Sequence, residues 1–113
     1  MAMVRVLKFK NDEKDRDRFI MLYQGFLAGG NSPGAKPLDV RRTEGKVLDK
    51  FEAAGKIEGD AVSFNKEEAE LTLEQPEYEL LKKYFEATPW VTAFSRKVLS
   101  ISDWMASITP EDR

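Results

Sequence analysis

Residues 70–108 constrain the fold more than any other stretch, because they combine a strand pattern with two proline-marked helix starts. Leu71 and Leu73 alternate with polar residues, which is the period-2 pattern of a half-buried strand. Pro76 suits the first position of a helix, where its missing N–H costs nothing. Apolar residues then recur at helical spacing. The stretch predicts a short strand over residues 70–74 and a helix over residues 76–87.

A second proline marks the start of the last predicted helix. Thr88 precedes Pro89, which displaces Thr88 from helical backbone angles, so we expect Thr88 to cap a helix that continues to Ile108. Trp90 would then lie at the corner between two helices. An apolar stripe runs along this last helix, through Val91, Phe94, Val98, Ile101, Met105 and Ile108. The stripe either packs inside the domain or also covers a partner chain, and the sequence leaves both open.

Two further helices are predicted in the first half of the chain. The first is capped by Asn11 or Asp12, carries an apolar face from Phe19 to Leu27, and ends at Gly29 or Gly30 before a loop over residues 29–37. The second spans residues 38–54, where Gly45 indicates a close approach of another helix. Strands are expected over residues 3–9 and 61–65. Residues 61–65 would form a hairpin with residues 70–74, while residues 3–9 either pair with 70–74 or act as an arm.

These elements predict an α+β, mostly helical fold, with four main helices and a minor two- or three-stranded antiparallel sheet or hairpin. The length of 113 residues indicates one domain over residues 1–113, with a possible N-terminal strand or arm over residues 1–10 and a frayed tail over 109–113. Truncating Phe85 or Phe94 to alanine is expected to cost about 3–5 kcal/mol. The predicted core contains Phe19, Tyr23, Phe26, Val47, Phe51, Leu73, Leu81, Phe85, Phe94, Val98 and Ile101.

The chain contains no histidine and no cysteine, which removes the commonest general base, metal ligand and thiol nucleophile. No calcium-loop pattern is present either. We therefore expect a non-enzymatic protein without catalytic residues, metal, cofactor or small-molecule substrate. No apolar run is long enough to span a membrane. The composition is that of a soluble protein, and we expect it in the cytoplasm.

The net charge of −2 conceals an uneven distribution along the chain. Residues 1–57 carry twelve basic and eight acidic side chains, whereas residues 58–79 carry one lysine and eight acidic side chains. Segments of opposite charge permit a head-to-tail contact between copies. The overall acidity makes nucleic acid an unlikely partner.

One basic cluster supports an alternative function. Arg41, Arg42, Lys46 and Lys50 lie on the second predicted helix, although Asp39, Glu44, Asp49 and Glu52 dilute them. Two helices followed by a hairpin also resemble a winged helix in element order. The alternative is therefore a winged-helix-like nucleic-acid-binding transcription regulator, on fold analogy alone.

Residues 38–108 also resemble small phage- and prophage-encoded proteins of about this length. The similarity is carried by Leu-Asp-Lys-Phe-Glu-Ala-Ala over residues 48–54, Leu-Thr-Leu-Glu-Gln-Pro-Glu-Tyr-Glu-Leu-Leu over residues 71–81, Thr-Pro-Trp over residues 88–90 and the terminal amphipathic helix. The resemblance implies a virion accessory or assembly protein, or a small host-directed regulator, that acts by binding proteins. It carries over no functional residue.

The sequence is therefore interpreted as a protein–protein interaction module that binds protein partners and forms a homo-oligomer. Large aromatic residues often anchor interfaces. The candidate interaction residues are Trp90, Trp104, Met105 and Ile108. The competing interpretation is that Trp90 and Trp104 fill the core of a monomer.

Overall fold

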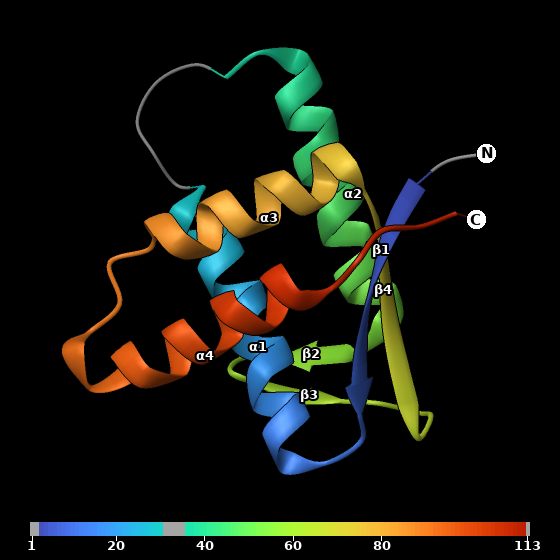
Figure 1. Ribbon diagram of the computed structural model, residues 1–113. Helices are drawn as coiled ribbons and strands as arrows, with labels where there is room; N and C mark the ends of the chain where they lie inside the picture. Colours follow the sequence, from blue (N-terminus) through green and yellow to red (C-terminus); the bar gives the residue numbers. More distant parts are fainter. Residues whose placement is uncertain (1–2, 31–35, 113) are drawn as a thin grey trace.

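The computed structural model describes residues 3–30 and 36–112, so the predicted loop over residues 29–37 falls mostly outside the described residues. The predicted fold class is confirmed: the chain is α+β and mostly helical, with four α-helices in the described ranges (Figure 1). In chain order the elements are β1 (Met3–Lys10), α1 (Glu13–Gly29), α2 (Leu38–Ala54), β2 (Lys56–Glu58), β3 (Ala61–Ser63), β4 (Glu68–Glu74), α3 (Gln75–Ala87), the 3-10 helix η1 (Thr92–Phe94), α4 (Ser95–Ser107) and β5 (Glu111–Asp112).

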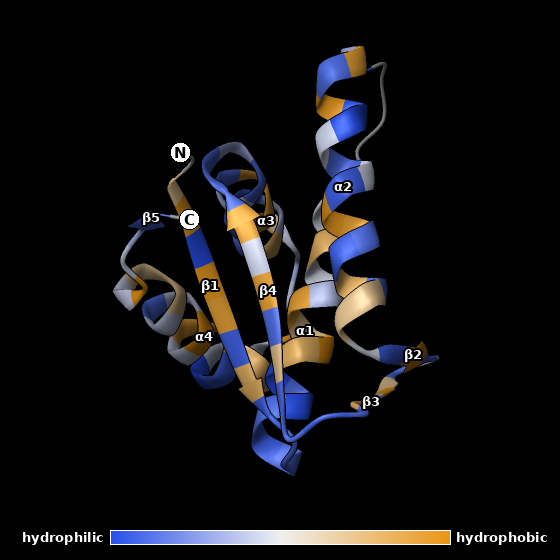
Figure 2. Ribbon diagram, turned by 90° about the vertical axis from the view of Figure 1, so that its right-hand side faces the viewer, coloured by the Kyte–Doolittle hydropathy of each residue, from blue (hydrophilic) through white to orange (hydrophobic). Residues whose placement is uncertain are grey.

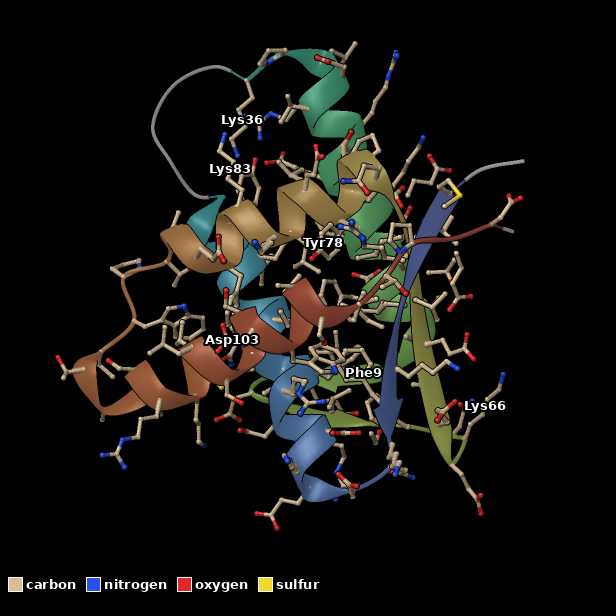
Figure 3. All side chains as sticks on the ribbon, viewed as in Figure 1. Phe9, Lys36, Lys66, Tyr78, Lys83 and Asp103 are labelled. Carbon is tan, nitrogen blue, oxygen red and sulfur yellow. The ribbon has the colours of Figure 1, made fainter. Side chains whose placement is uncertain are left out.

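The main sheet has the strand order β4-β1-β5, and both pairings are antiparallel. The predicted pairing of the N-terminal strand with residues 70–74 is confirmed, with Leu7 opposite Leu71 and Phe9 opposite Ala69. These four side chains are buried on the face that the helices cover. Phe9 and Tyr78 lie between the helices and the sheet, whereas Lys66 points outward near the start of β4 (Figure 3).

The other face of the sheet is not covered by a helix, and α1 and α3 lie behind the strands in Figure 2. On this face Lys8 stands opposite Glu70, and Lys10 stands opposite Glu68. Directly opposed unlike charges stabilise an antiparallel pair. The acidic and basic segments of the sequence are therefore brought together within one chain along β1 and β4.

The predicted hairpin between residues 61–65 and 70–74 is wrong. β3 pairs instead with β2, through Ile57 opposite Val62, around a turn in which Gly59 has a positive φ of 62°. A β-turn with a glycine in left-handed geometry closes this short hairpin at no steric cost. β4 is thereby left to pair with β1, from the opposite end of the chain.

The start of α3 is fixed by a buried carboxylate. Glu77 is 3 % exposed, and its Oε1 accepts a hydrogen bond from the backbone N–H of Glu74 at 2.9 Å and a second from Nζ of Lys50 on α2. A carboxylate in the first turn also interacts favourably with the helix dipole. The N-cap is Glu74, one residue before the predicted Gln75.

The close crossing of α1 and α3 depends on two glycines one helical turn apart. A Cβ on Gly29 would lie 1.8 Å from the backbone oxygen of Tyr84, and a Cβ on Gly25 would lie 2.8 Å from Cδ1 of Phe85. A larger side chain at Gly29 would strike the backbone of α3, whereas one at Gly25 would have to displace the rings of Phe85 and Trp90. Gly45 was the glycine predicted to mark a close approach, and that prediction is wrong, because a Cβ there would meet nothing within 4 Å.

The last helix begins later than predicted. Thr88 does not cap it: residues 88–91 are not helical, η1 follows, and α4 starts only at Ser95. Ile101 and Met105 face the core, whereas Phe94 is 42 % exposed, so its predicted place in the core is wrong. Phe94 continues the sequence stripe, but it is not among the described residues that form the core cluster or pack against it.

The remaining predicted core positions lie in or against one cluster of apolar side chains. Tyr23 and Val98 are only partly buried and pack at its margin. Edge-to-face contacts organise its aromatic residues, with the ring of Phe19 within 5.2–5.3 Å of the rings of Phe9, Phe51 and Phe64.

The predicted frayed tail is also wrong for the residues described, because Glu111 and Asp112 pair with Val4 and Met3 as β5. None of the helices in the described ranges is long and apolar enough to cross a bilayer.

Alanine substitutions at Gly29, inside the crossing, and at Gly45, outside it, test the crossing. Gly29→Ala is expected to lower the free energy of unfolding by at least about 2 kcal/mol, because its Cβ would strike backbone rather than a movable side chain. Gly45→Ala is the matched control and should raise that energy by about 0.5–1 kcal/mol, because it adds helix propensity in open space. Urea unfolding measures both. A stabilising Gly29→Ala would contradict the crossing.

Candidate protein-binding surface

The connection between α3 and α4 projects from the body of the molecule (Figure 1), and residues 88–94 are called the hook below. Thr88 ties its base to two helices. The Oγ1 of Thr88 lies 2.8 Å from the backbone oxygens of both Gly25 on α1 and Tyr84 on α3, so its single proton is shared between them. The threonine predicted to cap α4 instead ties the end of α3 to α1.

Trp90 provides the second anchor of the hook. Its Nε1 donates a hydrogen bond to the backbone oxygen of Phe85 at 3.0 Å, and its ring lies 5.3 Å from the ring of Phe85. The ring also occupies the space beside Gly25, where a Cβ would come within 2.9 Å of Cζ2. The hook is therefore held against the α1–α3 crossing rather than left as a free loop.

The outer surface of the hook is apolar. Val91 is 59 % exposed and Phe94 is 42 % exposed, and the backbone N–H of Phe94 donates to the oxygen of Val91 at 2.9 Å, so the two lie close together. Nζ of Lys97 lies 5.9 Å from the centre of the Phe94 ring. Contiguous exposed apolar patches mark binding surfaces, and an anchored turn that carries two exposed apolar residues is a candidate for one.

The structure places the predicted interaction residues in different environments. Met105 is fully buried in the chain's own core, so it cannot be presented to a partner in this conformation. Trp90, Trp104 and Ile108 are partly buried and pack against the same core. The packing of the tryptophans against the core therefore agrees with the competing interpretation, in which they complete the core of a monomer. Their role in partner binding stays a prediction. The sequence analysis placed Val91 in the apolar stripe of the last predicted helix. The spacing of apolar residues could not show that α4 begins only at Ser95 and leaves Val91 outside it.

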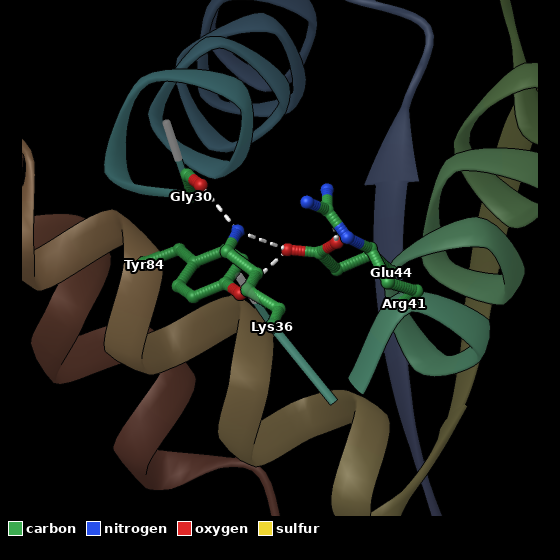
Figure 4. Close-up of polar contacts among 5 residues, drawn as sticks. All are labelled: Gly30, Lys36, Arg41, Glu44 and Tyr84. Atoms are coloured by element: carbon green, nitrogen blue, oxygen red, sulfur yellow. Dashed lines mark hydrogen bonds and ion pairs between the residues drawn. The ribbon is translucent and has the colours of Figure 1, made fainter. Parts of the chain in front are cut away.

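A second polar cluster joins the region before α2 to α3 (Figure 4). Oε2 of Glu44 accepts hydrogen bonds from Nζ of Lys36 at 2.5 Å and from the hydroxyl of Tyr84 at 2.6 Å. Lys36 also donates to the backbone oxygen of Gly30 at the end of α1. No sequence pattern predicts this cluster, because Tyr84 lies 40 residues from Glu44 along the chain.

The cluster fixes the charge of its members. Burial of the Glu44 carboxyl disfavours ionisation, but the hydrogen bonds from Lys36 and Tyr84 outweigh it, and the pKa of Glu44 is lowered from 4.5. The hydrogen bond to Glu44 raises the pKa of Lys36, and burial together with that carboxylate raises the pKa of Tyr84. An ion pair with a neutral tyrosine holds helices together at neutral pH, and it offers neither a base nor a nucleophile poised for catalysis.

The basic cluster of α2 is partly engaged. Lys50 binds Glu77, and a nitrogen of Arg41 lies 3.8 Å from Glu44. Arg41, Arg42 and Lys46 are all exposed on the helix, as are the acidic residues Asp39, Asp49 and Glu52. A nucleic-acid recognition face is strongly basic, and this helix mixes both charges.

Chemistry and comparison give no further lead to function. In the part of the chain that the structure describes, no group of three or more acidic, histidine or cysteine side chains is arranged to hold a metal ion. No protein-family model matches the chain, and no curated protein or solved structure shows significant similarity to it. Function is therefore inferred from the surfaces described above.

Glu44→Gln tests the polar cluster and its pH dependence. Because the pKa of Glu44 is lowered in the folded state, its ionised carboxylate stabilises the fold above pH 4.5, and this contribution is lost as the pH falls through the lowered value. The variant should be less stable than the parent by about 1 kcal/mol at neutral pH, and the difference should shrink in acid. Urea unfolding at neutral pH and at a series of acidic pH values measures the difference in free energy of unfolding.

Glu52→Gln is the matched control, because Glu52 is an exposed glutamate on the same helix. Its effect should stay within about 0.5 kcal/mol at neutral pH. A stability difference for Glu44→Gln that stays constant as the pH falls would contradict the role assigned to the carboxylate.

Proposed function

We propose that this chain is a protein-binding module that uses the hook as its contact surface. The resemblance of the sequence to small phage-encoded proteins adds to the proposal: the chain serves as a virion accessory or assembly protein, or as a small regulator that acts on protein partners. The observation that carries the proposal is the pairing of exposed Val91 and Phe94 on a segment anchored by Thr88 and Trp90.

The anchoring supports binding on energetic grounds. A flexible loop must lose conformational entropy when a partner orders it, and this loss weakens binding. The hook is already held by the hydroxyl of Thr88 and the indole of Trp90. Its apolar surface can therefore be covered at a small entropic cost.

The support for a head-to-tail homo-oligomer is weaker than the sequence suggests. Lys8 and Lys10 face Glu70 and Glu68 within the same sheet, and Lys50 binds Glu77. Part of the charge complementarity is thus used inside one chain. Self-association through the hook remains one form of the proposal, and binding of a different protein is the other.

Nucleic-acid binding is the alternative function, and no specific observation favours it. Arg41, Arg42 and Lys46 are the exposed cations of the α2 cluster, and the chain carries a net charge of −2. Contacts to phosphate would have to overcome that charge.

The test combines Val91→Ser with Phe94→Ser. Both side chains lie outside the core cluster, so the double variant should change the free energy of unfolding by less than about 1 kcal/mol. It should nevertheless lose self-association in light scattering, or lose the partner recovered by affinity pull-down and mass spectrometry from the source cells. The physical reason is that the contact loses its apolar centre.

Leu38→Ser is the matched control, because Leu38 is 66 % exposed at the start of α2, away from the hook. It should keep association and partner. The proposal is contradicted if the parent chain is strictly monomeric and recovers no partner, or if the control loses binding to the same extent as the double variant.

A further inference from the structure

A positively charged groove lies beside the hook, between the N-terminal halves of α1 and α4. It has a volume of about 290 Å³. Because the whole chain has a net charge of −2, this concentration of positive charge is local. This basic groove is defined by Lys14, Asp17, Arg18, Arg96, Lys97 and Ile101.

Two of its cations are held in place by the protein. The guanidinium of Arg18 lies 4.4 Å from the centre of the Trp104 ring and 3.3 Å from a carboxylate oxygen of Asp15. Nζ of Lys97 lies 3.3 Å from Oδ2 of Asp17, which joins the two walls of the groove. Trp104 therefore has a defined role, because it supports a cation at the groove.

The other two cations are available to a ligand. Lys14 and Arg96 are exposed, and within the described residues neither has a hydrogen-bond or ion-pair partner. An arginine guanidinium binds a carboxylate through two parallel hydrogen bonds, and such charge-assisted pairs are stronger than neutral ones. One wall of the groove therefore offers a free lysine and the other a free arginine.

Apolar side chains accompany these charges. Ile101 lies in the lining as a buried residue, and Phe94 of the hook is next to Lys97. A ligand that uses the whole surface must carry both negative charge and an apolar group. Acidic peptide segments combine the two, whereas inorganic anions do not.

We propose that the basic groove binds an acidic segment of a partner protein, with carboxylates on Arg96 and Lys14 and an apolar side chain against Phe94. The inference rests on the proposed function and names the chemistry of the partner. A polynucleotide fits less well, because the lining includes the carboxylate of Asp17, which would repel a continuous row of phosphates, whereas a peptide can separate its carboxylates with apolar residues.

The experiment measures binding by fluorescence anisotropy with the full chain. The probes are a fluorescein-labelled peptide of Glu-Glu-Leu-Phe repeats, the same peptide with glutamine in place of glutamate, and a labelled single-stranded oligonucleotide. The glutamate peptide should bind, and its affinity should fall as salt rises from about 0.1 M to about 1 M because screening shortens the range of the charges. Arg96→Glu and Lys14→Glu should each weaken it by about tenfold.

Lys46→Glu is the control, because Lys46 is an exposed lysine on α2 outside the groove, and it should bind like the parent. Circular dichroism verifies that each variant is folded. Equal binding of both peptides, tighter binding of the oligonucleotide, or no binding of the glutamate peptide would overturn the inference. Concentration-dependent self-association that Arg96→Glu abolishes would also overturn it, because the occupant would then be a second copy. If the hook variant loses its partner while Arg96→Glu keeps it, the proposed function survives and the acidic partner does not.

Discussion

The close crossing of α1 and α3 is the constraint on which the rest of the structure depends. Gly25 and Gly29 leave no side chain between the two helices, so the backbone of α3 at Tyr84 lies directly against α1. This approach brings the Thr88 hydroxyl within reach of the Gly25 carbonyl and leaves room for the Trp90 ring. The position of the hook, and hence of the start of α4, follows from the crossing. A change at either glycine would therefore reach the candidate binding surface as well as the core.

Many of the charged side chains are paired with opposite charges within the chain itself. Glu77 and Glu44 each bind a lysine and connect α2 or the residues before it to α3, and the open sheet face sets lysines opposite glutamates. Buried pairs of this kind stabilise little against apolar alternatives, but they specify which surfaces meet. Lys14 and Arg96 take no part in this arrangement and line one groove, and the two facts together make them candidates for an external ligand.

Local patterns in the sequence predicted the helices and the fold class. They did not predict contacts between residues that are far apart along the chain. The stripes of α1 and α3 are read correctly because a helix makes its contacts at fixed spacing. Residues 61–65 were assigned to the following strand, but β3 pairs with β2, and β4 pairs with β1 across more than half of the chain, which was one of two alternatives for the N-terminal strand. Thr88-Pro89 matches a helix start, yet the Thr88 hydroxyl is used in tertiary hydrogen bonds. In the candidate site, the position of Trp90 at a corner between two helices was predicted. The exposure of Phe94 was not predicted, because it depends on which other elements pack against Phe94.

The hook and the basic groove are best understood as one surface with two kinds of attraction. Phe94 belongs to the hook, and Lys97 beside it belongs to the groove. An apolar contact supplies affinity by excluding water, while fixed charges select the partner and its orientation. Arg18 on Trp104 and Lys97 on Asp17 keep the charged wall in place before a ligand arrives. The two tryptophans support the hook and the groove from within, so the proposed binding would not require that either ring touch the partner.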